Sequence, residues 1–169
     1  DDIVHGSGKV SPIDDIEIIN TELILSDLSI VEKLYQKAQK NTKSGQKEGM
    51  PMKELVEKIL TALKEGTSLR KLTFGKEELV LLKNFQLLTL KPVLYVANVN
   101  ESGFENNPHL DLILDYATQD HSKVVPICAE IEAEICELSN DEKKEFLLEM
   151  GQNESGLDRL IKALSLIHI

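Results

Sequence analysis

The chain has 169 residues, of which 41% are hydrophobic, 28% are charged and only 4% are aromatic, and its formal net charge at pH 7 is −10. This apolar fraction excludes a disordered chain, and the length suits one domain or slightly more. No stretch approaches the roughly 18 uninterrupted apolar residues of a membrane span, and two cysteines make neither a disulfide framework nor a four-ligand zinc site. We expect a soluble, cytoplasmic globular protein with no membrane partner. Because the chain starts with Asp and ends in an apolar run, we also expect it to be part of a longer protein.

Positive charge is concentrated in one stretch of this acidic chain. Between Lys33 and Lys76 there are eleven basic and four acidic residues, a net charge of +7, whereas the remainder has 8 basic and 25 acidic residues, a net charge of −17. Such a cluster fits either a solvated helical pair or an arm that faces a polyanion such as RNA. Few aromatic residues accompany it, so contacts to nucleic acid would go to the backbone, without DNA specificity. The lysines predicted for this surface are Lys37, Lys40, Lys43 and Lys47.

The first half of the chain has the periodicity of helices. Residues 1–20, with two glycines and a proline, predict an exposed entry segment. Apolar residues recur every three or four positions over 21–38 and 55–63, which is the period of amphipathic helices, and the intervening segment 41–51 is typical of a turn. We therefore predict an antiparallel helical (coiled-coil) arm over residues 21–88, which ends with a third helix at 76–88.

The second half has alternating strand and helix patterns. Residues 93–97 and 124–127 are short apolar runs that predict buried strands. Asn107 and Pro108 are a typical cap and first-turn pair for a helix between them, and further helices are predicted at about 130–137, 140–150 and 156–164. This order predicts an α/β fold with a parallel sheet. Residues 1–20 and 89–169 would form one domain, with further strands supplied from upstream.

Two polar loops follow the predicted strands, Asn98-Val99-Asn100-Glu101 and Cys128-Ala129-Glu130. Ligands of open α/β sheets lie beyond the carboxyl ends of the strands, so a nucleotide base is expected there. In guanine-binding P-loop proteins the first loop reads Asn, Lys, any residue, Asp, and the Asp accepts hydrogen bonds from two guanine donors. Val99 and Glu101 replace that Lys and Asp, and an Asn amide also suits adenine. Adenine is therefore at least as well suited as guanine, although two Asn in a loop are also ordinary turn chemistry.

Other candidate motifs do not meet the requirements of their chemistry. Gly6-Ser7-Gly8-Lys9-Val10 is not a phosphate-binding loop, because the first Gly, the Ser or Thr after the Lys and a preceding strand are all missing. The four histidines are scattered, which predicts no metal site. Cys128 and Cys136 are interpreted as small buried apolar residues, and no catalytic residue is predicted.

Three segments together resemble the YchF (Obg-like) ATPase family. Residues 11–23, SPIDDIEIINTEL, are similar to the sequence that follows the second switch region of that family. Residues 88–108 resemble its altered base-specificity motif, and residues 125–138 resemble its second base-contacting loop. The resemblance covers nearly the whole chain, including the helical insertion. The family consists of ribosome-associated P-loop ATPases, related to translational GTPases, with a helical arm in the nucleotide-binding domain and a C-terminal TGS domain.

The resemblance implies a partial P-loop NTPase-type sheet with an inserted arm, in a protein that binds ATP, or GTP, and hydrolyses it with Mg²⁺. The base would be contacted by Asn98, Val99, Asn100 and Glu101, with Cys128 and Ala129 closing the pocket. The family's P-loop, switches, magnesium ligands and TGS domain are not among these 169 residues, so we expect no hydrolysis by this chain alone. The alternative is a non-catalytic module that binds RNA, the ribosome or a protein through the arm.

Overall fold

The computed structural model describes residues 11–43 and 50–167 and divides them into two compact units. One unit is helical and comprises Asp14–Pro92. The other comprises the described residues before Asp14 together with those from Val93 onward. The helical unit extends beyond residues 21–88, the bounds predicted for the arm.

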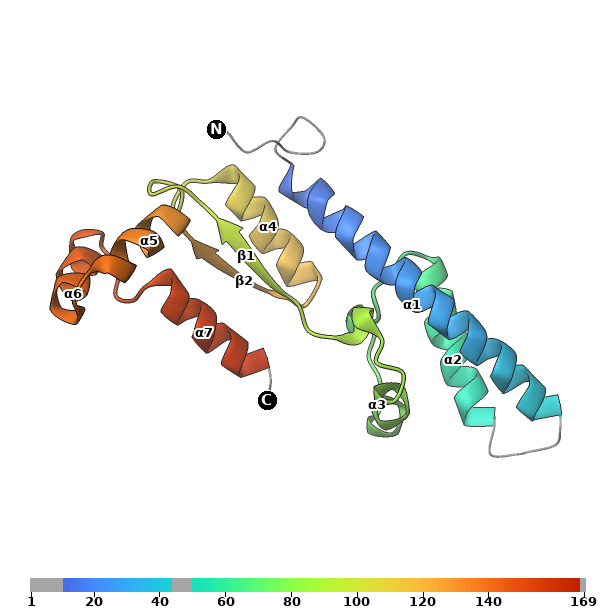
Figure 1. The fold of residues 1–169 in the computed structure, drawn as a ribbon. Coiled ribbons are helices and arrows are strands. Elements are labelled where there is room, and N and C mark those ends of the chain that lie inside the picture. Colours follow the sequence, from blue (N-terminus) through green and yellow to red (C-terminus); the bar gives the residue numbers. More distant parts are fainter. Residues whose placement is uncertain (1–10, 44–49, 168–169) are drawn as a thin grey trace. The chain divides into compact units, whose positions relative to one another are not determined.

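The helical unit is built on two long helices, α1 (Pro12–Lys43) and α2 (Met50–Lys64), which run antiparallel and side by side (Figure 1). They are followed by a 3₁₀ turn at Leu69–Lys71, by α3 (Lys76–Lys83) and by a second 3₁₀ turn at Leu88–Leu90. The shared core confirms the amphipathic pattern of the sequence, because it contains Ile24, Val31, Leu55, Val56, Ile59, Leu60 and Leu63.

Two predictions in this half are wrong at their boundaries. The segment predicted as an exposed entry is helical from Pro12, because a proline suits a first turn and Asp14 and Asp15 complement the helix dipole there. The third helix ends at Lys83, five residues before its predicted end at Leu88. The predicted loop at residues 6–10 lies outside the described residues.

A buried carboxylate anchors the last turn of the helical unit, which comes shortly before the first strand in the chain. Asp27 of α1 is fully buried, and its Oδ1 accepts the Leu88 N–H at 2.8 Å. Its Oδ2 accepts both the N–H and the hydroxyl of Thr89 at 2.7 Å. Three donors compensate the carboxylate for its lost hydration. They also fix the 3₁₀ turn at Leu88–Leu90 against α1.

The α/β unit contains two parallel strands, β1 (Leu94–Asn98) and β2 (Lys123–Ile127), paired in a register that sets Asn98 opposite Ile127. They are connected by α4 (Pro108–Gln119), and α5 (Ala129–Glu137), α6 (Asn140–Glu149) and α7 (Gly156–Ile167) follow. Figure 1 shows α4 and α7 on opposite sides of the strands. The parallel pairing, together with the helical insertion, confirms the predicted α/β fold class.

Helix α4 packs on the sheet through the positions that helical spacing predicts, with one exception. Leu110, Ile113 and Ala117 are buried, but Leu114, which the three- and four-residue spacing from Leu110 and Ala117 also puts near this face, is 43% exposed. It lies at the margin of the buried face, one residue beyond Ile113. The predicted cap is confirmed, since Oδ1 of Asn107 accepts the N–H groups of His109 and Leu110.

Carboxylates close to the first turns of the later helices keep those ends ordered. The Ser139 hydroxyl, at the start of α6, holds the pKa of Glu142 below its ordinary value. The Ser155 hydroxyl, at the start of α7, does the same to the pKa of Asp158, which it contacts at 2.7 Å. Glu132 of α5 accepts the Gly156 N–H at 2.6 Å, so that α5 and α7 are joined beside β2.

The Asp27 anchor gives a direct stability prediction. In the Asp27→Ala variant the buried N–H of Thr89 and the partly buried N–H of Leu88 lose their acceptor, and the free energy of unfolding should fall by about 2–4 kcal/mol. Urea titration followed by circular dichroism measures this change. The control is Glu22→Ala, at an exposed position of the same helix. Equal stability of the two variants would contradict the anchoring role.

Candidate functional site

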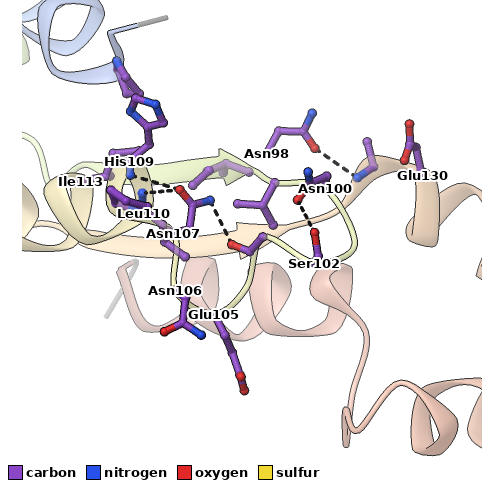
Figure 2. A pocket seen from close by; sticks show the side chains of 17 residues that line it. Asn98, Asn100, Ser102, Glu105, Asn106, Asn107, His109, Leu110, Ile113 and Glu130 are labelled. Atoms are coloured by element: carbon purple, nitrogen blue, oxygen red, sulfur yellow. Dashed lines mark hydrogen bonds between the residues drawn. The ribbon is translucent and has the colours of Figure 1, made fainter. Parts of the chain in front are cut away.

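The carboxyl ends of the two strands bring the two predicted loops together. The Val99 N–H donates to the Ile127 carbonyl at 2.8 Å, which continues the pairing one residue past β1. Oδ1 of Asn98 accepts the Ala129 N–H at 3.1 Å, as Figure 2 shows. A backbone N–H only donates, so this bond requires the amide oxygen of Asn98 on the side of Ala129. The amide nitrogen is directed elsewhere and is available as a donor.

The first loop makes a tight turn directly after these contacts. The Gly103 N–H donates to the Asn100 carbonyl at 2.9 Å, and Glu101 and Ser102 form the corner between them. A Cβ atom at Gly103 would lie 2.5 Å from Asn100 Oδ1 and 3.1 Å from Val99 Cβ. The Asn100 side chain can rotate away, but the Val99 Cβ atom and the Asn100 carbonyl oxygen, at 3.2 Å, leave little room for a side chain at position 103.

A cavity of about 980 Å³ lies along this edge of the sheet. Its wall is formed by β1, the loop after it, the first turns of α4 and the start of α5 (Figure 2). This volume is at the upper end of the range of small-molecule sites, roughly 300–1,000 Å³. Geometry alone therefore makes this edge the candidate ligand site.

Of the six residues predicted for base binding, four line the cavity and two do not. The structure brings Asn98, Val99, Asn100 and Ala129 to the cavity wall. Glu101 is exposed at the corner of the turn and does not line the cavity. Cys128 is 2% exposed, precedes the first residue of α5, and is also absent from the wall.

Several residues of the cavity wall were not predicted from the sequence. They come from the end of the loop and the start of α4, and they include Ser102, Gly103, Asn106, Asn107 and His109. The glycine and the run of asparagines in 103–107 were the available signal, since such residues mark a chain that turns sharply. Asn106 has a φ of 52°, in the left-handed region that Asn tolerates better than most residues.

The lysines predicted for the arm are partly described. Lys37 and Lys40 are exposed on α1, and Lys33, also exposed, lies four residues before Lys37. Spacings of four and three residues put these three lysines on one side of the helix. Lys43 is the last residue of α1, but its side chain and all of Lys47 lie outside the described residues.

The described residues were also searched for metal sites and membrane spans. They contain no group of three or more His, Cys, Asp or Glu side chains that could hold a metal ion. Within the same ranges, no helix has both the length and the hydropathy required to cross a membrane.

The fold and the site together define an open α/β domain with a helical insertion and a cavity at the carboxyl ends of its strands. No protein-family model matches the chain. The chain is 50% identical over 163 residues to the ribosome-binding ATPase YchF of Haemophilus influenzae and 47% identical over 163 residues to that of Escherichia coli O157:H7. It is 45% identical over 166 residues to that of Bacillus subtilis.

These matches cover 96% of this chain and 45% of each relative. The structure of the Schizosaccharomyces pombe YchF GTPase superposes with a TM-score of 0.83 at 26% identity, over 95% of this chain and 46% of that one. The chain is therefore a homologue of the YchF family along nearly its whole length, and it spans about 45% of the length of the curated relatives it matches.

The turn at Gly103 gives a prediction about loop geometry. The Gly103→Ala variant should lose about 1–3 kcal/mol in free energy of unfolding, because the new methyl group must displace Asn100 and Val99. The matched control is Gly75→Ala, where a Cβ would be 3.6 Å from its nearest neighbour, an ordinary contact. Thermal and urea unfolding of both variants measures the difference. A Gly103→Ala variant as stable as Gly75→Ala would refute the described turn.

Proposed function

We propose that this chain forms the base pocket and the helical arm of a cytoplasmic, ribosome-associated P-loop protein that binds and hydrolyses ATP. The observation that carries the proposal is the bond from the Ala129 N–H to the Asn98 side chain, which holds both loops against one cavity. Further support comes from the names of the bacterial relatives, ribosome-binding ATPases, and of the fission yeast relative, a GTPase. These names agree on a purine nucleotide and leave the choice of base to be argued from the residues.

The orientation of Asn98 supports recognition of a purine. With its oxygen engaged by Ala129, the amide presents its N–H₂ group, which pairs with an acceptor such as the purine N7. Adenine and guanine both have N7, so Asn98 would bind either base. Discrimination then rests on the neighbouring positions in the loop.

Position 101 is compatible with adenine. A carboxylate rewards guanine by accepting its two N–H donors, and adenine lacks that pair. Glu101 is exposed at the corner of the turn, where it keeps its hydration when no donors are offered. An adenine base therefore leaves no buried, unpaired carboxylate, which would be costly. Val99, which stands in place of the lysine, offers the base an apolar contact. Such a contact does not distinguish adenine from guanine, because it does not involve the donors and acceptors along the edge of the base.

Mg²⁺ belongs to the proposal for the full-length protein. The described residues contain no group of carboxylates or histidines suited to hold it, so none of them is assigned to the metal. The chemistry that Mg²⁺ supplies in phosphoryl transfer is neutralisation of charge on the phosphate oxygens.

The central test is nucleotide binding by the full-length protein. Asn98→Ala removes both the loop-to-loop bond and the donor to the base, and it should weaken ATP binding by about tenfold or more. Titration calorimetry with ATP and with GTP measures both dissociation constants. The control is Asn140→Ala, at an exposed position at the start of α6. Unchanged ATP affinity in Asn98→Ala, or a strong preference of the wild type for GTP, would contradict the proposal.

A second candidate function is docking of the arm on ribosomal RNA. It is favoured by the exposed stripe Lys33, Lys37 and Lys40, which lies on a helix whose opposite side packs in the core. Phosphate contacts require clustered positive charge and little else, so this stripe has the needed chemistry. In this reading the nucleotide regulates an association that the arm provides.

The salt dependence of ribosome association shows whether the lysines of the arm contact phosphates or are only solvated. Replacing Lys37 and Lys40 together with Glu should weaken ribosome association and flatten its dependence on salt concentration by about one unit of slope per lost contact. Cosedimentation over a salt series measures both quantities. The control replaces Lys123 and Lys144 with Glu, an identical charge change at exposed positions of the α/β unit. If both double variants bind alike, the stripe is not the docking surface.

A further inference from the structure

We propose that Asn107 is a positioning residue for the base-specificity loop, in addition to being the cap of α4. It acts through Gly103, which closes the turn that carries Glu101. This inference rests on the proposed function, because it concerns how the same loop is held for base recognition.

One side chain makes two kinds of contact. Oδ1 of Asn107 accepts the His109 N–H at 3.1 Å and the Leu110 N–H at 3.3 Å. Its Nδ2 donates to the Gly103 carbonyl at 3.0 Å, and Figure 2 shows all three bonds converging on this amide. The orientation is not interchangeable, since the helix supplies only donors and the loop supplies an acceptor.

Gly103 is consequently held on both sides of its Cα atom. Its N–H is bound by the Asn100 carbonyl, and its own carbonyl is bound by Asn107. At the other end of the loop, the Val99 N–H is bound by the Ile127 carbonyl. The four-residue turn from Asn100 to Gly103 is therefore pinned at both ends, and the side chain of Glu101 leaves it at a defined corner.

Asn107 is attached to a helix that packs in the α/β unit. The buried residues of that helix include Leu110 and Ile113. The left-handed conformation of Asn106, with a φ of 52°, turns the chain so that the amide of Asn107 reaches back to the loop. Packing of α4 is thus transmitted to the turn by one hydrogen bond.

The residue type at position 107 separates the two roles. Asp and Ser are as good as Asn at capping a helix N-terminus, because capping requires only an acceptor. Neither has an amide donor for the Gly103 carbonyl, and Asp would place a second oxygen beside it. Asn satisfies both requirements at once.

The experiment compares Asn107→Asp with wild type in the full-length protein. The cap is retained and only the bond to the Gly103 carbonyl is lost, so the midpoint of thermal unfolding should fall by no more than a few degrees. ATP binding should weaken by about three- to tenfold, the order expected for one hydrogen bond. Because the turn that begins at the cavity-lining residues Val99 and Asn100 is then less firmly held, the ratio of the GTP and ATP dissociation constants should move toward one. Asn107→Ser, a second capping residue without an amide, should shift the ratio in the same direction.

The control for general destabilisation is Ser139→Ala. This variant removes a hydroxyl at the start of α6 that donates to the Glu142 carboxylate, outside the two loops. It should lower the unfolding midpoint without moving the ratio of dissociation constants. If both Asn107 variants keep the wild-type ratio, or weaken ATP and GTP binding equally, Asn107 is a cap and the inference is overturned. If wild type binds neither nucleotide, the proposed function itself fails, and the inference falls with it.

Discussion

The hydrogen bond between the Asn98 side chain and the Ala129 N–H is the contact on which the proposed base pocket depends. It forms because the parallel register places Asn98 opposite Ile127, so that each strand ends beside the other and the two loops leave the sheet at the same edge. Without that pairing the loops would be separate turns. With it, Asn98 and Ala129, which are 31 positions apart in sequence, share one cavity wall, and the Asn98 amide offers its N–H₂ group to a ligand.

Single side chains also join neighbouring elements within each of the two units. Glu132 joins the start of α7 to α5, and Asn107 joins α4 to the turn at Gly103. In the helical unit, Asp27 fixes the 3₁₀ turn that precedes β1 in the chain. Each connection is made by one side chain that accepts or donates to backbone groups, and each lies at an element boundary where such groups have no partner in the helix or sheet.

The sequence was sufficient for the fold class because its signals were local. The apolar runs, the cap at Asn107 and the helical period of α2 all depend on neighbouring residues, and the structure confirms the strands, the cap and the helix. The prediction that the strands are buried is wrong in part, because within them only Ala97 and Val125 are buried and Val96 is 47% exposed. The start of α1 was missed because Pro12 was interpreted as a break, although a proline also suits a first turn. Asn98 and Ala129 were predicted to lie near each other because the carboxyl ends of parallel strands meet at the same edge of a sheet. The bond from Asn107 to Gly103 could not be predicted, since it depends on the φ of Asn106 and on the closeness of the turn.

The most direct test of the account is an experimental structure of the full-length protein with a bound adenine nucleotide. We expect the base to lie in the cavity between the Asn98 loop and the start of α5, with Asn98 Nδ2 within hydrogen-bonding distance of N7. We also expect that the Ala129 N–H still donates to Asn98 Oδ1. A base bound elsewhere, or an Asn98 side chain that has left Ala129 and faces solvent, would contradict the central claim.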